Sequence, residues 1–212
     1  MTRNALFSSL VLSGLLFLGG CADEAVKKAD AVKKDPPKIE PVSGNKAFFL
    51  MYGAARGWAL DAQPYSLISL ELDGVPKVPG KAGAWQATFA SPGSRKAKAY
   101  TYCVIEGPGN LHKGVFAGLE ESWSGPRGSN ELFIVQALKV DSDKALETAI
   151  QKGKNAAEYV KKNPDKRIFY LLEKNKRHPN LTWRVLWGDS VSTSNYSVFV
   201  DASTGQYLET MR

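Results

Sequence analysis

The side chains that most often carry catalysis and metal binding are scarce in this sequence. It contains two cysteines, Cys21 and Cys103, and two histidines, His112 and His178. Metal sites need clustered histidine, cysteine or carboxylate ligands, and no group of these residues has a suitable spacing. Glycine-rich phosphate loops and serine nucleophile elbows are also missing from the sequence. We therefore predict a protein that is not an enzyme, with no catalytic residue and no metal.

Cys103 is the one thiol that could act as a nucleophile in the folded part, with a histidine as its base. It lies in the alternating segment Tyr100-Thr101-Tyr102-Cys103-Val104-Ile105, which is typical of a β-strand. Buried cysteines commonly act as small apolar residues, so we predict a structural role for Cys103. A deep pocket that joined it to either histidine would favour an enzyme instead.

A long hydrophobic run is lacking as well. The apolar stretch from Ala5 to Leu18 is interrupted by serines and a glycine, whereas a membrane-spanning helix needs roughly 20 apolar residues. A stretch of this length that follows a positive charge, here Arg3, is typical of a signal peptide. It ends in Leu18-Gly19-Gly20-Cys21, which resembles the lipobox of bacterial lipoproteins.

The lipoprotein resemblance implies that residues 1–20 are removed and that the sulfur of Cys21 carries a covalent lipid. We expect no other cofactor. The protein would then be anchored in the cell envelope. Ala22, rather than aspartate, follows the cysteine, which implies the outer membrane, facing the periplasm. With Cys21 modified, Cys103 could form no intramolecular disulfide.

Negative charge is in deficit, because 28 lysine and arginine residues stand against 21 aspartate and glutamate residues, a formal net charge of +7. Residues 21–45 are nearly balanced in charge and contain several prolines, so we predict a flexible tether there and place the excess in the folded part. Export argues against nucleic acid as a partner. Anionic lipid, a cell-wall polymer or an acidic protein fits better, although an ordinary solvated surface is the simplest explanation of the charge.

Residues 131–212 show the pattern of one strand, a helix and three further strands. The first strand is expected over 131–140. Ser142 is a candidate N-cap, and apolar residues then recur at helical spacing until Asn163 and Pro164 end the helix. Three alternating segments follow, with apolar positions at Ile168, Tyr170 and Leu172, at Trp183, Val185 and Trp187, and at Tyr196, Val198 and Val200.

Residues 46–130 repeat the order of a helix followed by three strands, and the strand expected over 131–140 is extra to this plan. A helix is predicted over 46–62, and its apolar stripe is wide enough to indicate burial on most sides. Strands follow, and residues 112–130 are interpreted as a connector. Trp85 lies 98 positions before Trp183, whereas Tyr100, Val104 and Gly109 lie 96 before Tyr196, Val200 and Gly205. We interpret this as a duplicated unit with a two-residue loop difference. The apolar strand positions are Ile68, Leu70, Leu72, Trp85, Ala87, Phe89, Tyr100, Tyr102 and Val104.

The second unit, residues 131–212, resembles a PepSY-like module, a relative of cystatin-like α+β folds. The resemblance rests on Ser142-Asp143-Lys144-Ala145-Leu146, on Trp183-Arg184-Val185, and on Val198-Phe199-Val200-Asp201-Ala202-Ser203-Thr204-Gly205. The first unit departs from it, with Ile105-Glu106-Gly107-Pro108-Gly109 in place of that ending. In the second unit we expect Asp201 to be a turn residue that accepts backbone N–H bonds before Gly205.

This resemblance implies an α+β fold with two tandem helix-plus-antiparallel-sheet units, 46–130 and 131–212, after the signal peptide and tether. PepSY-like modules are noncatalytic domains of envelope proteins and protease pro-regions, and several are thought to inhibit or chaperone proteases. No inhibitory loop can be carried over to residues of this sequence.

Two surface features are candidates for binding. Trp123 lies in a glycine-rich connector, where it could anchor a partner or fill the seam between the units. The basic segment 152–177 could meet an acidic partner or an anionic membrane, or be a solvated surface. Its candidate binding residues are Lys161, Lys162, Lys166 and Arg167.

The predicted function is that of a lipid-anchored cell-envelope protein with a noncatalytic protein-binding, scaffolding or protease-restraining role. The expected partners are the membrane, through the lipid anchor, and an envelope protein or peptidase. The alternative is a lipoprotein that binds a small ligand or a cell-wall polymer in a groove between the units.

Overall fold

The computed structural model describes residues 38–126, 128, 130–188, 190 and 192–212. The predicted signal peptide (1–20), the predicted lipidation site Cys21 and tether residues 22–37 lie outside the described residues. Lys38–Arg212 form one compact unit. The predicted tether boundary at residue 45 is too late, because Pro41, Val42 and Gly44 are already buried in this unit.

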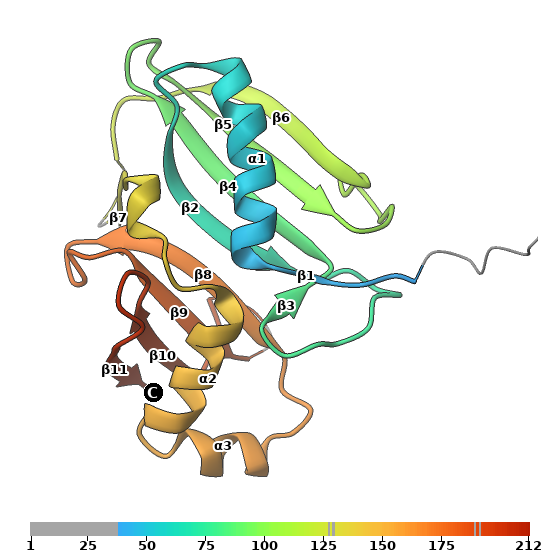
Figure 1. The fold of residues 1–212 in the computed structure, drawn as a ribbon, viewed down its shortest axis with the longest axis vertical. Helices are drawn as coiled ribbons and strands as arrows, with labels where there is room; N and C mark the ends of the chain where they lie inside the picture. The colour runs from blue at the N-terminus through green and yellow to red at the C-terminus, as the bar shows by residue number, and fades with distance from the viewer. Residues whose placement is uncertain (1–37, 127, 129, 189, 191) are drawn as a thin grey trace, which may run out of the picture. The chain divides into compact units, whose positions relative to one another are not determined.

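A large antiparallel sheet and three α-helices give the described residues a mixed α+β fold, which confirms the predicted class (Figure 1). The strand order is β6-β5-β4-β2-β8-β9-β10-β11. Strands β2 to β6 belong to the first half of the chain and β8 to β11 to the second, and the two halves join where β2 pairs with β8. The strands are β2 (Gln63–Leu70), β4 (Ala84–Ser91), β5 (Lys96–Cys103), β6 (Gly114–Ser122), β8 (Ile168–Asn175), β9 (Thr182–Trp187), β10 (Tyr196–Asp201) and β11 (Tyr207–Met211). Short strand β7 (Asn130–Glu131) pairs with β8, and β1 (Val42–Ser43) pairs with β3 (Lys81–Ala82).

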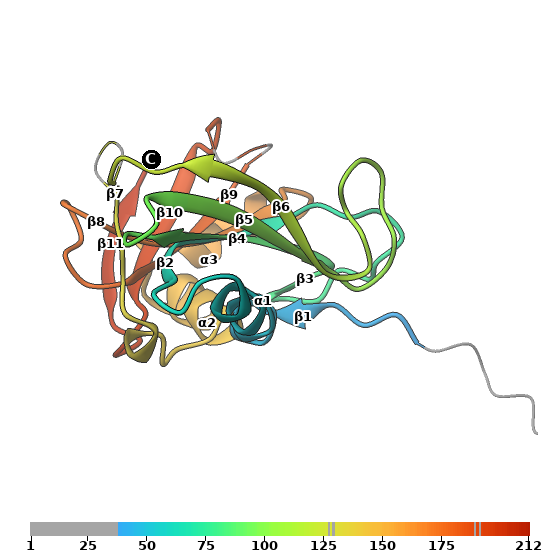
Figure 2. The same ribbon diagram turned by 90° about the horizontal axis from the view of Figure 1, so that it is seen from above.

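The two longer helices cover the same side of the sheet (Figure 2). Helix α1 (Gly44–Trp58) packs on β4 and β5, and helix α2 (Ser142–Lys152) packs on β9 and β10. The core lies between helices and sheet, and its largest fully buried side chains include Trp85, Trp183 and Trp187. These tryptophans were predicted from the alternation of their strands, because alternate residues of a strand face the same side.

The halves of the molecule repeat the same contacts at a spacing of 98 residues. The indole Nε1 of Trp85 donates to the carbonyl oxygen of Val42 at 3.1 Å, and that of Trp183 donates to Val140 at 2.8 Å. The two rings meet edge to face with centroids 6.4 Å apart. The helices begin 98 residues apart, and buried Ala47, Phe48 and Met51 of α1 correspond to buried Ala145, Leu146 and Ala149 of α2.

The spacing of 96 predicted for the last strands of each half is wrong. Trp85 of β4 pairs with Tyr102 of β5, and Trp183 of β9 pairs with Val200 of β10. Both pairs of strands are therefore related by 98, and no loop difference is needed. The sequence comparison had matched tyrosine with tyrosine, but register is set by the backbone ladder and by which face is buried.

The single helix predicted from Ser142 to the residues before Pro164 is divided in two. Helix α2 ends at Lys152, and α3 (Ala156–Lys162) begins after Asn155, which has a left-handed backbone. Gly153 lies at the break, where a Cβ atom would stand 2.8 Å from Cγ2 of Val198. The chain therefore passes too close to the sheet for a side chain. The N-cap is Asp141 and not Ser142, because Asp141 Oδ1 accepts from the Ser142 amide at 2.7 Å.

Two further predictions between residues 112 and 140 are wrong. The segment predicted as a connector contains β6, an outer strand of the sheet. The strand predicted over 131–140 is mostly irregular and contains the short 3-10 helix η1 (Val135–Ala137). Glycines at 114 and 118 hid the alternation of β6. Helix α1 also ends earlier than predicted, at Trp58 and not at residue 62, because the backbone is already extended at Ala59.

The turn after β10 agrees with its prediction. The Asp201 carboxylate accepts hydrogen bonds from the amides of Ser203 and Thr204, each at 2.8 Å. Gly205 then takes a φ of +76°, which favours glycine. Asp201 is therefore a turn residue in this fold.

Candidate functional site

Cys103 ends β5 and is enclosed by apolar side chains. It is 1% exposed and packs with Leu72 and Ala84, as predicted for a structural cysteine. Burial, followed by the nearby charge of Glu106, raises the pKa of the Cys103 thiol. A raised pKa disfavours the thiolate that a nucleophilic cysteine needs.

Both histidines are engaged with neighbouring side chains. Nδ1 of His112 lies 3.4 Å from Oε2 of Glu106, and its ring packs on Phe116 with centroids 4.6 Å apart. Nε2 of His178 lies 2.9 Å from Oε1 of Glu209. Among the described residues, no three histidine, cysteine or acidic side chains are grouped so that they could hold a metal ion.

One cavity is a groove of about 590 Å³, which we call the inter-half groove. One wall is the loop that connects β2 to β4, residues 71–83, and the other is residues 164–170, which lead into β8. Its volume lies in the range of roughly 300–1,000 Å³ that is typical of ligand sites. Its lining includes the partly or largely exposed apolar side chains Leu70, Val75, Pro76, Val78, Ile168 and Phe169.

Charged side chains of both signs stand along the groove. Arg167 pairs with Glu71 at 2.6 Å and so connects the two walls. Both partners are about half exposed, and ion pairs of this kind contribute little to stability. A ligand could therefore displace the pair at low cost. The remaining charged residues of the lining are Asp73, Lys77, Lys81, Asp165 and Lys166.

A buried hydrogen-bond network fixes one end of the loop wall. The amide of Gly80 donates to the Tyr170 hydroxyl at 2.8 Å, and the Ser142 hydroxyl donates to the Gly80 carbonyl at 2.6 Å. The amide of Gly44 in turn donates to the Ser142 hydroxyl oxygen at 2.8 Å. Burial raises the pKa of Tyr170 to about 12, so its hydroxyl stays protonated at neutral pH. The groove is therefore rigid where α1 and α2 begin.

Gly80 is required by this arrangement for two reasons. Its φ of +77° lies in the left-handed region, and a Cβ atom at this position would overlap the Cα of Asp143. The loop can approach α2 this closely because residue 80 has no side chain.

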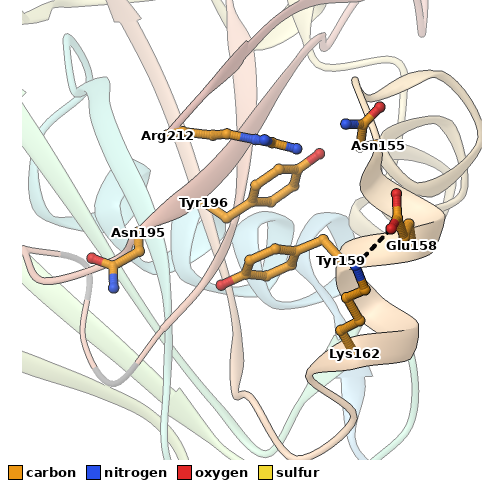
Figure 3. Close-up of a pocket in the computed structure, with 7 residues that line it drawn as sticks. All are labelled: Asn155, Glu158, Tyr159, Lys162, Asn195, Tyr196 and Arg212. Carbon is orange, nitrogen blue, oxygen red and sulfur yellow. Dashed lines mark hydrogen bonds and ion pairs between the residues drawn. The ribbon is translucent and has the colours of Figure 1, made fainter.

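A smaller cavity of about 320 Å³ lies between α3 and β10 (Figure 3). The rings of Tyr159 and Tyr196 stack with centroids 4.3 Å apart. The guanidinium of Arg212 lies 5.6 Å from the Tyr196 ring centroid, on the side away from Tyr159. Lys162 is paired with Glu158 at 2.7 Å. Because both faces of Tyr196 are covered, this cavity offers less aromatic surface than its lining suggests.

The predicted binding residues are divided among several places. Lys166 and Arg167 line the inter-half groove, and Lys162 lines the smaller cavity. Lys161 is exposed on α3. Trp123 lines neither cavity, and its ring packs edge to face on Tyr65 with centroids 5.1 Å apart. The structure thus assigns Lys166 and Arg167 to one groove but does not unite all five residues.

Sequence reasoning missed the loop wall of the groove. Its signal is Asp73-Gly74-Val75-Pro76-Lys77-Val78-Pro79-Gly80, an apolar and proline-containing connection between paired strands. Connections between adjacent antiparallel strands are usually two to five residues long. A longer connection that keeps apolar side chains is a signal for a functional loop.

No helix in the described ranges is both long enough and apolar enough to cross a bilayer. Comparisons of this chain with protein-family models, with curated proteins and with solved structures gave no match.

Proposed function

We propose that this protein is a noncatalytic binding protein of the cell envelope, anchored through a lipid on Cys21 at the outer membrane and facing the periplasm. The lipobox-like sequence Leu18-Gly19-Gly20-Cys21 supports the anchor. The burial of Cys103 and the engagement of both histidines support binding over catalysis.

The halves of the molecule are, in this proposal, two copies of one PepSY/cystatin-like unit. The contacts repeated at a spacing of 98 support a duplication. In each half the strands follow chain order outward from the β2–β8 join, and one helix covers the sheet. A helix packed on an antiparallel sheet is the arrangement that the PepSY resemblance implies.

The inter-half groove is the observation that carries the binding proposal. It combines apolar walls, charged residues of both signs and one rigid end. These features suit an extended segment of another envelope protein, whose apolar side chains would enter the groove while its polar groups meet the charged residues. Such a contact would scaffold the partner, or restrain it if the partner is a peptidase.

Site-specific photo-crosslinking in intact cells tests this proposal. Val78 is 37% exposed in the groove, and a photoreactive residue there should crosslink to one reproducible envelope protein. Lys144 is exposed on α2 and is the control position. Phe169→Glu should abolish the crosslink from position 78 without changing the amount of protein. Equal labelling from positions 78 and 144, or persistence of the product in Phe169→Glu, would argue against the groove.

A small ligand or a cell-wall polymer is the second candidate, because the groove volume also fits a small molecule. Fragments of cell-wall polymer should then raise the melting temperature of the wild type, since a ligand at 100 times its Kd adds about 2.7 kcal/mol of stability. The Phe169→Glu variant should show no such shift. A shift that survives this substitution would place the ligand elsewhere.

A further inference from the structure

The outer face of α1 carries two large apolar side chains that are only about half buried by the described residues. Phe49 is 48% and Leu50 is 44% exposed. The sequence predicted burial of this helix on most sides, but the described chain buries it on the sheet side alone. The exposed residues of α1 recur at intervals of three and four and so form one stripe: Lys46, Phe49, Leu50, Gly53, Arg56 and Gly57.

Helix α2 provides an internal comparison, because its inner face matches that of α1 at a spacing of 98. Its outer face does not match. The positions that correspond to Phe49, Leu50 and Gly53 are Glu147, Thr148 and Gln151 in α2. Glu147 forms an ion pair with Lys144 at 2.8 Å. Packing on the sheet therefore does not require apolar residues on the outer face, and the stripe on α1 needs another explanation.

The charges of α1 favour an anionic surface over a second copy of the helix. The helix has no acidic residue, and its stripe carries Lys46 and Arg56. Two such helices would bring their cations together, and neither helix would supply an acidic residue to pair with them. Anionic lipid headgroups would complement them, because long basic side chains reach the headgroups while their stems lie along apolar surface. Helix α3 packs against α2, and Lys152 on α2 and Lys161 on α3 are exposed as well.

The chain leads into α1 directly from the part that precedes the described residues. Lys38–Pro41 approach on the helix side of the sheet (Figure 2), and α1 begins at Gly44. Sixteen residues separate Cys21 from Lys38, and a segment of this length spans at most about 60 Å. With Cys21 anchored as proposed, the stripe is always within reach of the bilayer.

We propose that the outer face of α1 docks on the surface of an anionic lipid bilayer. Phe49 and Leu50 enter the boundary between headgroups and acyl chains, and Lys46 and Arg56 contact lipid phosphates. The inference rests on the proposed anchor for the nearness of the membrane, and it adds a second contact that would orient the anchored body.

Vesicle flotation of residues 21–212 with Cys21→Ser tests the face without the lipid anchor, and this chain contains all described residues. It should float with vesicles that contain about 30% phosphatidylglycerol and bind more weakly to neutral vesicles or at high salt. Replacing the stripe with the residues of α2, in Phe49→Glu/Leu50→Thr, should lower the partition coefficient about tenfold or more. The control change on α2, Glu147→Gln/Thr148→Ser, should alter the partition coefficient by no more than about twofold. That is well under the roughly tenfold effect expected from losing buried apolar area.

The melting temperature and the circular dichroism spectrum of each variant check its folding. Both should change little, because Phe49, Leu50 and Glu147 are exposed and Thr148→Ser removes only one methyl group. Lys46→Glu/Arg56→Glu is a second variant of the same face, and it should also lose binding to anionic vesicles. Absence of flotation by the parent chain would overturn the proposal. Flotation of both stripe variants to the same extent as the parent would do so as well.

Gly53→Ala is a further test of the lipid surface. A methyl group adds apolar area, and a Cβ atom at this position meets no heavy atom within 4 Å, so binding to vesicles should stay equal or rise. A loss of vesicle binding in Gly53→Ala would overturn the lipid proposal. The mass of the native chain tests the anchor separately. An unmodified Cys21 would contradict the proposed function, whereas an acylated Cys21 with no flotation of the Ser variant would contradict the docking face alone.

Discussion

The first and second halves of the molecule are alike where they pack and different where they meet solvent. The connection from the first to the second strand of the first half, residues 71–83, contains β3 and forms a wall of the inter-half groove. The corresponding connection in the second half, residues 176–181, is short and carries His178, which contacts Glu209 of β11. The inner faces of α1 and α2 match in their buried positions, whereas the outer faces do not.

This difference shows which positions the fold restricts. Residues between helix and sheet must fill one core at high density, so both halves bury corresponding positions, such as Trp85 and Trp183. Loops and outer faces have no such constraint. The loop wall of the inter-half groove and the stripe on α1 are both features of the first half that the second half lacks. The strongest candidates for function therefore lie where the halves differ.

The largest effects should come from the equivalent tryptophans of the core. Trp85 and Trp183 are both 0% exposed, so Trp85→Ala and Trp183→Ala should each lower the free energy of unfolding by about 3–5 kcal/mol. Urea unfolding measures both values. Trp123, which is partly exposed, is the control, and its replacement by alanine should cost clearly less. The two losses in the free energy of unfolding should be similar. If they differed by more than about half the width of the expected range, the two halves would not be equivalent.

A smaller loss is expected from Gly80, where the first half contacts the start of α2. Gly80→Ala should destabilise the protein by about 3 kcal/mol, because it combines an unfavourable φ with a steric overlap at Asp143. Gly74 has a similar φ of +79°, but a Cβ atom there would lie 3.7 Å from Ile105. Gly74→Ala should therefore cost about 1 kcal/mol, from backbone conformation alone.

Thermal unfolding of both glycine variants gives the comparison. If Gly80→Ala and Gly74→Ala destabilised the protein equally, the steric overlap of residue 80 with α2 would contribute nothing to the loss of stability. The Gly80→Ala variant should also lose the groove crosslink from position 78, since the rigid end of the wall is disturbed.

The inner faces could be predicted from the sequence because alternation and helical spacing report burial directly. Trp85, Ala87 and Phe89 were assigned to the core side of a strand, and all three are fully buried. The first strand was less clear, because Leu67 and Ile68 are adjacent and both apolar. Leu67 is the fully buried one, whereas the predicted alternation had placed Ile68 on the core face. A one-residue ambiguity of this kind reverses every side chain of a strand.

The candidate site could be predicted only in part, because it depends on contacts distant in sequence. Lys166 and Arg167 were selected by charge, but their partner wall comes from residues 71–83. The contact of Gly80 with Ser142 joins residues 62 positions apart, and no local pattern encodes it. Trp123 was selected as a lone aromatic residue, yet it packs on Tyr65 of β2. Local patterns identify residue chemistry, whereas tertiary contacts decide which residues meet.

A pH-dependent difference is expected at Asp201, whose equivalent in the first half is Cys103. Burial alone would raise the pKa of Asp201, but the amides of Ser203 and Thr204 and the side chain of Asn180 outweigh it and hold the pKa below its usual value. A carboxyl group with a lowered folded pKa stabilises the protein above its unfolded pKa of about 4. That stability is lost as the pH falls through the folded pKa.

Asp201→Asn should therefore reduce the free energy of unfolding by about 1–3 kcal/mol at pH 7. The gap between the wild type and this variant should shrink as the pH falls below about 4. Chemical denaturation at a series of pH values measures the gap. A gap that stays constant into the acid range would mean that the charge of Asp201 contributes nothing to the turn.

The smallest effect should be a gain in stability on the outer face of α1. A Cβ atom at Gly53 would have no heavy atom within 4 Å, and glycine in an exposed helix costs roughly 0.5–1 kcal/mol relative to alanine. Gly53→Ala should therefore raise the free energy of unfolding by about that amount. The equivalent change on α2, Gln151→Ala, should alter it by a few tenths of a kcal/mol at most. Thermal unfolding in the absence of lipid measures both. A loss of stability in Gly53→Ala would show that the isolated chain uses this glycine for a contact of its own, and the contrast between the outer faces of α1 and α2 would then be a matter of internal packing.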